Sequence, residues 1–135
     1  MKRQRQVAAA FSQNEIDELA RQWQRELKIM DWQIGVRIVR GKRLGGDDGG
    51  VNFEEKRREA FIMLLDPRDV AKDRMTPYDM EVTLVHELLH CALACFTGKV
   101  LGGHEDITQE QQIHTMSQTL VRLRRAGLPT AEAAA

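Results

Sequence analysis

Two histidines and a glutamate interrupt an apolar run at residues 84–90, LVHELLH. On a helix, His86 and His90 lie one turn apart on the same side, so both imidazoles can reach one tetrahedral metal ion. Glu87 follows about 100° further round the helix, where its carboxylate can take a proton from a water held by the metal. The H-E-x-x-H spacing therefore predicts a zinc-dependent hydrolase, with His86 and His90 as metal ligands and Glu87 as the catalytic general base.

The residues around this motif predict a buried helix, because a helix that is apolar nearly all round lies in a core. The apolar residues are Val82, Leu84, Val85, Leu88, Leu89, Leu93 and Phe96. A buried polar group without a partner costs about 2–7 kcal/mol, so the two histidines and the glutamate need compensation. A bound Zn²⁺ ion supplies it, and a polar network without a metal is the alternative.

Two elements are predicted before the motif, a helix and then a strand. The helix begins at Ser12, where SQNE has the form of a capping box, and ends at about Lys28. Its apolar residues recur at helical spacing, and they are Ile16, Leu19, Trp23 and Leu27. Residues 32–38 alternate apolar and polar side chains, which predicts a half-buried strand from Trp32 to Ile38.

The segment between residues 41 and 67 predicts a loop followed by a β-hairpin. The first part, GKRLGGDDGG, is too rich in glycine for a packed element and predicts a mobile loop. The hairpin strands are Val51–Glu55 and Ala60–Leu65, and the continuous apolar run of the second predicts deeper burial. An exposed edge of either strand could pair with an extended substrate.

Two helices complete the chain. Thr76 and Pro77 predict the start of the motif helix, which continues to about Phe96. A last helix is predicted from about Thr108 to Gly127. Its expected core stripe is Ile113, Met116, Leu120 and Leu123.

These elements indicate one α+β domain over residues 1–135. It has an N-terminal helix, a small, mainly antiparallel three-stranded sheet, the HExxH helix and a C-terminal backing helix. With 42% hydrophobic residues the chain can bury a real core. We expect residues 1–11 and 129–135 to be flexible.

Charge and composition exclude several classes of function. Twenty Lys and Arg balance twenty Asp and Glu, so no net field attracts nucleic acid or anionic lipid, and neither is an expected partner. The local basic clusters are interpreted as surface charge, and they are Lys2–Arg3–Arg5, Lys56–Arg57–Arg58 and Arg122–Arg124–Arg125. No apolar run is long enough for a membrane span or a secretory signal, so we expect a cytoplasmic protein.

The two cysteines, Cys91 and Cys95, stand four residues apart on the predicted motif helix. Neither their spacing nor a cytoplasmic compartment suggests a disulfide. We interpret both as small core residues.

With HELLH on a buried helix, an apolar strand ending in Asp66–Pro67 before it and a helix after it, the chain resembles the zincin metallopeptidases, specifically the small gluzincin-like domains. The stretches GGVNFEEKRREAFIMLLDP, TLVHELLH and EQQIHTMSQTLVRL are also similar to short metallopeptidase-like proteins of phages and prophages. The resemblance covers roughly residues 30–125. It implies a zinc peptidase acting on peptides or proteins in a bacterium or a phage-infected cell. It also implies a cleft walled by the sheet and a third ligand from the backing helix.

Four residues are candidates for that third ligand: His104, Glu105, Glu110 and His114. Zinc in a catalytic site takes three protein ligands and a water. Glu110 is assigned as the third ligand, because gluzincins use a glutamate of the next helix and because a carboxylate is stabilised near a helix N-terminus. His114 departs from the pattern, since it stands where gluzincins usually carry an acidic residue. A SprT-type arrangement would use His104, but Glu105 follows it in place of a glycine. A metzincin pattern is excluded by Leu93 and Phe96.

Two other functions stay open beside the peptidase. One is a zinc-stabilised binding or assembly protein of a phage or mobile element with little activity, and the other is a SprT-like DNA-associated protease, which rests on the basic clusters alone. Glu87 favours catalysis, because a structural zinc site is closed by four protein ligands and has no use for a base. No residue is identified that would stabilise the oxyanion, and Tyr78 is expected to pack near the start of the motif helix.

Overall fold

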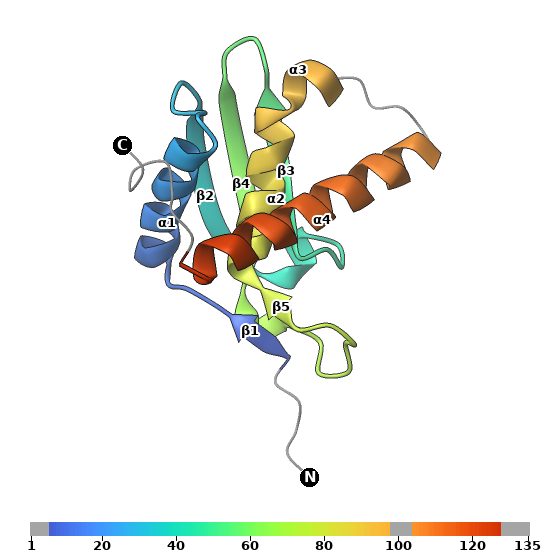
Figure 1. The fold of residues 1–135 in the computed structure, drawn as a ribbon. Coiled ribbons are helices and arrows are strands. Elements are labelled where there is room, and N and C mark those ends of the chain that lie inside the picture. Colours follow the sequence, from blue (N-terminus) through green and yellow to red (C-terminus); the bar gives the residue numbers. More distant parts are fainter. Residues whose placement is uncertain (1–5, 98–103, 128–135) are drawn as a thin grey trace.

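A mixed three-stranded sheet supports the helices (Figure 1). The computed structural model describes residues 6–97 and 104–127, and for Thr97 and residues 104–106 the main chain alone. In spatial order the strands are β2 (Gln33–Val39), β4 (Glu59–Leu65) and β3 (Gly49–Glu54). The strand β4 runs parallel to β2 and antiparallel to β3. The predicted α+β class and the hairpin are confirmed, and the strand expected at residues 32–38 lies one residue later.

The expectation of a mainly antiparallel sheet is wrong. After β2 the chain passes through the short 3₁₀ turn η1 (Gly41–Arg43) and lays β3 on the far side of β4. The strand β4 therefore returns parallel to β2, with Val36 beside Ile62. The alternation of apolar and polar side chains within one strand indicates which face of the strand is buried, but not which neighbouring strand it pairs with.

The strand β4 is the centre of the sheet, and it is more deeply buried than its hairpin partner β3, as predicted. Ile62 and Leu64 are fully buried, whereas every residue of β3 is half-buried or exposed. Because β4 has a partner on each side, it cannot offer an edge to a substrate. The outer edge of β3 remains for that role.

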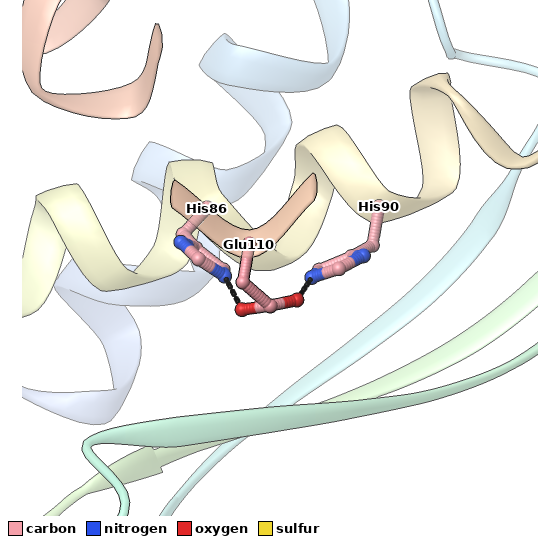
Figure 2. A group of neighbouring side chains, drawn as sticks. All are labelled: His86, His90 and Glu110. Atoms are coloured by element: carbon pink, nitrogen blue, oxygen red, sulfur yellow. Dashed lines mark hydrogen bonds and ion pairs between the residues drawn. The ribbon is translucent and has the colours of Figure 1, made fainter. Parts of the chain in front are cut away.

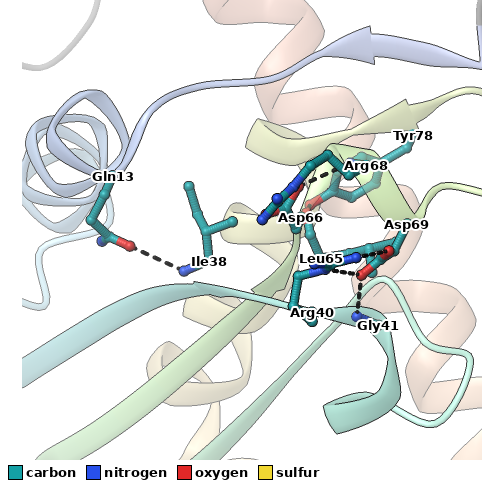
Figure 3. Close-up of polar contacts among 9 residues, drawn as sticks. All are labelled: Gln13, Ile38, Arg40, Gly41, Leu65, Asp66, Arg68, Asp69 and Tyr78. Carbon is teal, nitrogen blue, oxygen red and sulfur yellow. Dashed lines mark hydrogen bonds and ion pairs between the residues drawn. The ribbon is translucent and has the colours of Figure 1, made fainter.

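The helix α1 (Gln13–Glu26) begins with the predicted capping box, since the Glu15 amide donates to Ser12 Oγ at 3.2 Å and the Ser12 amide to Glu15 Oε1 at 2.9 Å. Its buried apolar residues are Ile16, Ala20 and Trp23. The Gln13 side chain donates to the carbonyl of Val36 at 2.8 Å. It also accepts from the Ile38 amide at 3.1 Å (Figure 3). The helix is thereby fixed to the free edge of β2.

The loop after β2 is anchored rather than loose. The Asp69 carboxylate, in the 3₁₀ turn η2 (Pro67–Asp69), accepts from Arg40 Nε and from the Gly41 amide, both at 2.7 Å (Figure 3). Further along, Leu44 is only 8% exposed. Glycine content alone was a poor guide to mobility here, because one apolar side chain and two polar bridges hold the segment.

The helix α2 (Met80–Ala92) carries the HExxH motif and starts later than predicted. Tyr78 and Asp79 are extended as β5 (Tyr78–Asp79), which pairs in parallel with β1 (Val7–Ala9). Asp79 caps the helix by accepting from the amides of Glu81 and Val82. Part of the segment 1–11 that was expected to be flexible therefore forms a strand, and residues 129–135 lie outside the described residues.

The expected place of Tyr78 beside the start of the helix is confirmed. The side chain is fully buried, and its hydroxyl donates to the Leu65 carbonyl at 2.8 Å (Figure 3). Beyond α2, the short helix α3 (Ala94–Thr97) replaces the predicted continuation to Phe96.

The helix α4 (His104–Arg125) crosses α2 on the side away from the sheet (Figure 1). It begins four residues before the predicted Thr108. Its buried face consists of Ile113, Ser117 and Val121, whereas Met116 and Leu123 are each 40% exposed. The predicted core stripe is confirmed at Ile113 and in part at Leu120, which is half-buried against the core, and it is wrong at Met116 and Leu123. A serine occupies the middle of the buried face, where its hydroxyl donates to the His114 carbonyl and so needs no water.

No helix within the described ranges combines the length and the apolar character needed to cross a membrane.

The two cysteines differ in burial, and their reactivity should differ accordingly. Cys91 is 2% exposed, as predicted, and burial raises the pKa of its thiol to about 12, whereas Cys95 is exposed on α3. We expect a disulfide reagent to label one thiol of the native protein rapidly at pH 8, because the thiolate is the reacting species. Cys95→Ala should remove that rapid phase, and Cys91→Ala should leave it. Equal labelling of both thiols before unfolding would contradict the packing of α2.

Candidate metal centre

Three side chains from two helices converge on one point beside the sheet. The Nε2 atom of His86 lies 2.9 Å from Glu110 Oε2, and Nε2 of His90 lies 2.7 Å from Glu110 Oε1 (Figure 2). The candidate ligand atoms of the three residues all lie within 4.8 Å of one another. The structure therefore brings together the two histidines of α2 and the predicted glutamate of α4.

The packing of α4 on α2 explains why Glu110 reaches this point. Glu110, Ile113, Ser117 and Val121 recur at helical spacing, so they share one side of α4. The last three are buried against the body of the protein, which turns Glu110 toward the histidines at the start of the same stripe.

The other end of α4 is held by an arginine clamp. Arg125 donates to both carboxylate oxygens of Asp79, at 2.6 and 3.0 Å, and to Glu81 Oε1 at 3.0 Å. Glu81 is 6% exposed and also accepts from the Trp23 indole at 2.8 Å. Sequence reasoning missed this clamp, because it interpreted the Arg122–Arg124–Arg125 cluster as surface charge. The one sign of the clamp in the sequence is that two acidic residues, Asp79 and Glu81, stand at the start of the motif helix.

Glu87 lies beside the triad without belonging to it. Its carboxylate is 3.9 Å from His86 Nε2, and no hydrogen bond to it occurs among the described residues. The residue is 6% exposed. Burial, reinforced by the charges of Glu110 and Asp47, raises the pKa of Glu87 to about 8. A cation held by the triad would favour the charged carboxylate again.

The two imidazoles are largely buried, with side-chain exposures of 14% for His86 and 17% for His90. Burial lowers the pKa of His86 below the usual histidine value, although Glu110 opposes that shift. A neutral imidazole is the form that binds a metal ion. The electrostatics at His86 therefore favour the ligand form.

The residues present fit a zinc ion. Two imidazole nitrogens and one carboxylate oxygen are a donor set of catalytic zinc sites, with bonds of about 2.0–2.2 Å and hence ligand atoms about 3.4 Å apart. The contacts of Glu110 with the histidines are slightly shorter than that, so a small outward shift of its carboxylate admits the ion. The same donors also suit other transition metals, and the geometry does not select among them.

The remaining ligand candidates are placed less favourably or lie outside what is described. His114 lines the same hollow, with its ring centroid 5.9 Å from that of His86, but it is not one of the clustered ligand groups. The main chain of His104 and Glu105 is helical rather than in the predicted loop, and their side chains lie outside the described part of the chain.

A cleft of about 260 Å³ opens beside the triad. Its lining residues are Asp47, Asp48, Gly49, Thr83, His86, Glu87, Glu110 and His114. Sequence reasoning missed Asp47 and Asp48 because it assigned residues 41–50 to a mobile loop.

Gly49 allows this part of the cleft to form. A Cβ atom at this position would lie 2.6 Å from Thr83 Cγ2 and 3.0 Å from the carbonyl oxygen of Met63. Only glycine therefore lets β3 approach α2 this closely, next to His86 and Glu87.

Comparison of the chain with protein-family models, with curated proteins and with solved structures found no significant match.

Substitution of Gly49 tests the close approach of β3 to α2. Gly49→Ala should lower the free energy of unfolding by about 1–3 kcal/mol, the usual cost of overpacking, in urea denaturation. Gly50→Ala is the matched control, because its Cβ would meet nothing closer than Leu44 at 3.9 Å. Equal stability of the two variants would contradict the close contact.

Zinc binding tests the triad directly. We expect alanine at His86, His90 or Glu110 to weaken zinc binding by more than about 100-fold, because loss of a residue that only orients a ligand already costs 10- to 100-fold. His114→Ala should keep the stoichiometry, measured by equilibrium dialysis and elemental analysis. If Glu110→Ala retains zinc while His104→Ala loses it, the SprT-type assignment replaces this one.

Proposed function

We propose that this chain is a zinc-dependent metallopeptidase of the zincin type, with Glu87 as the general base. One observation carries the proposal: two histidines and a glutamate meet at one point, and beside them in the same cleft lies a buried carboxylate that accepts no hydrogen bond from the described residues. His86, His90 and Glu110 would hold the metal. A bound zinc ion lowers the pKa of a water to about 7 and polarises the carbonyl group that is attacked.

Glu87 supplies the proton transfer. Its carboxylate faces the cleft and lacks a hydrogen-bond partner among the described residues, so it is free to accept the proton of the attacking water. The same group can then deliver that proton to the leaving amine. A group that must both take and return a proton works best with a pKa near the working pH, and burial moves Glu87 in that direction.

The edge of β3 is the proposed place for the substrate main chain. Among the described strands, β3 pairs only with β4, which leaves its outer side without a partner strand. Gly49, at the start of β3, lines the cleft that holds Glu87. An extended peptide added along this edge would pass in front of the triad.

A purely structural metal site is the competing proposal. Such sites are usually closed by four protein ligands, whereas three cluster here among the side chains that the structure describes, and Glu110 remains 53% exposed. A structural site also gains nothing from Glu87, whose burial without a partner is costly. These observations favour the hydrolase over a zinc-stabilised assembly protein.

The DNA-associated alternative has less support. Arg125 of the third basic cluster binds Asp79 and Glu81, and Arg124 donates to Gln22 and stacks over the Trp23 ring at 5.0 Å. These two side chains serve the packing of α4 rather than a free basic surface.

Glu87→Gln separates catalysis from structure. The amide keeps the shape but cannot accept the proton, so we expect zinc content and the melting temperature to be retained while hydrolysis of a quenched fluorescent peptide library falls at least about 100-fold. Glu18→Gln, an exposed glutamate of α1 that does not line the cleft, is the matched control and should keep full activity. Turnover that is equal in wild type and Glu87→Gln would sink the proposal, and a zinc-loaded wild type without turnover would favour the assembly protein.

A further inference from the structure

The cleft beside the triad has an uneven distribution of charge. Among the described residues, four carboxylates line it, those of Asp47, Asp48, Glu87 and Glu110, and no lysine or arginine does. Three of them already have a role or a partner. Arg74 donates to both oxygens of Asp48 at 2.9 Å, Glu110 lies between the histidines, and Glu87 is buried beside His86.

Asp47 is the carboxylate that remains. No hydrogen bond or ion pair to its side chain occurs within the described part of the chain, and the residue is exposed at the cleft wall.

The main chain on both sides of Asp47 is fastened. On one side, its amide donates to the carbonyl of the buried Leu44 at 3.2 Å. On the other side, the Asp48 carbonyl accepts from the Leu65 amide at 2.9 Å, and Arg74 ties the Asp48 side chain to the Thr76 carbonyl. Asp47 is therefore held at a fixed place on the wall, which a charge needs if it is to select among ligands.

We propose that Asp47 is a specificity-determining residue, which makes the cleft prefer substrates with a lysine or arginine side chain next to the bond that is cleaved. The inference rests on the proposed function, since it concerns the substrate class of the same site. A cationic side chain in this cleft gains an ion pair with Asp47, the exposed carboxylate that has no partner among the described residues. An acidic side chain meets the like charge of Asp47, and no lysine or arginine stands along the described lining to pair with it.

Binding of small hydroxamates to the zinc-loaded protein tests this preference without catalysis. A hydroxamate occupies an open zinc position, and its neighbouring side chain can be lysine, norleucine or glutamate with similar bulk. Two series place that side chain on the acyl side or on the amine side of the zinc-binding group. Dissociation constants are measured by titration calorimetry at low salt for the wild type, Asp47→Asn, Asp47→Lys and Asp31→Asn.

Asp31→Asn is the matched control, because it removes the same charge from an exposed residue that pairs with Arg58 away from the cleft. In at least one series we expect the lysine compound to bind about fivefold more tightly than the norleucine compound, both to the wild type and to Asp31→Asn. A gain in affinity of about fivefold is what one solvent-accessible ion pair contributes. Asp47→Asn should abolish that difference, and Asp47→Lys should shift the preference to glutamate.

A second readout maps cleavage sites in a mixed peptide library by mass spectrometry. Lysine and arginine should be enriched beside the cleaved bond for the wild type and not for Asp47→Asn. Hydroxamates that bind the wild type equally whatever their side chain, in both series, would overturn the role of Asp47 while leaving the metallopeptidase proposal intact. Failure of every hydroxamate to bind the zinc-loaded wild type would overturn the open metal site itself, and this inference with it.

Discussion

The position of α4 across α2 is the constraint on which the metal centre depends. Glu110 belongs to the outer helix and both histidines to the inner one, so the triad exists only at one crossing of the two. The stripe Ile113, Ser117 and Val121 sets that crossing through burial, and Ser117 permits close packing because its side chain is small and its hydroxyl is satisfied within α4. Each residue of the stripe is remote from the triad, yet a shift of α4 by one helical turn would move Glu110 by about 5 Å.

The far end of the crossing is fixed by charge rather than by apolar contact. Arg125 joins the last turn of α4 to the cap of α2, and Glu81 extends the link to the Trp23 indole of α1. Because Glu81 is buried, loss of Arg125 would leave its carboxylate with the indole alone, a change that costs more than the ion pair itself gains. The three helices are thereby coupled through one carboxylate, and the crossing angle is specified at both ends.

The sequence could predict what is encoded locally. The capping box at Ser12, the hairpin and the HExxH helix depend on residues within a few positions of one another, and each is present in the fold. The parallel pairing of β2 with β4, the strand pair β1 and β5, and the true stripe of α4 depend on partners far along the chain. The anchored loop with Asp47 was missed for the same reason, since Arg74 and Leu65 hold it from a distance.

Two glutamates of α2 are equally buried, but their surroundings differ. The difference favours a structural role for one and a chemical role for the other. Glu81 and Glu87 are each 6% exposed. Glu81 accepts from an indole and a guanidinium, which offset the loss of water, so it is a fixed point of the packing. Glu87 accepts no hydrogen bond from the described residues, and burial, with the charges of Glu110 and Asp47, raises its pKa to about 8. A fold selected for stability alone gains from a partner at both positions. The missing partner at Glu87 is intelligible if a cation at the triad and a water in the cleft take that place when the site is filled.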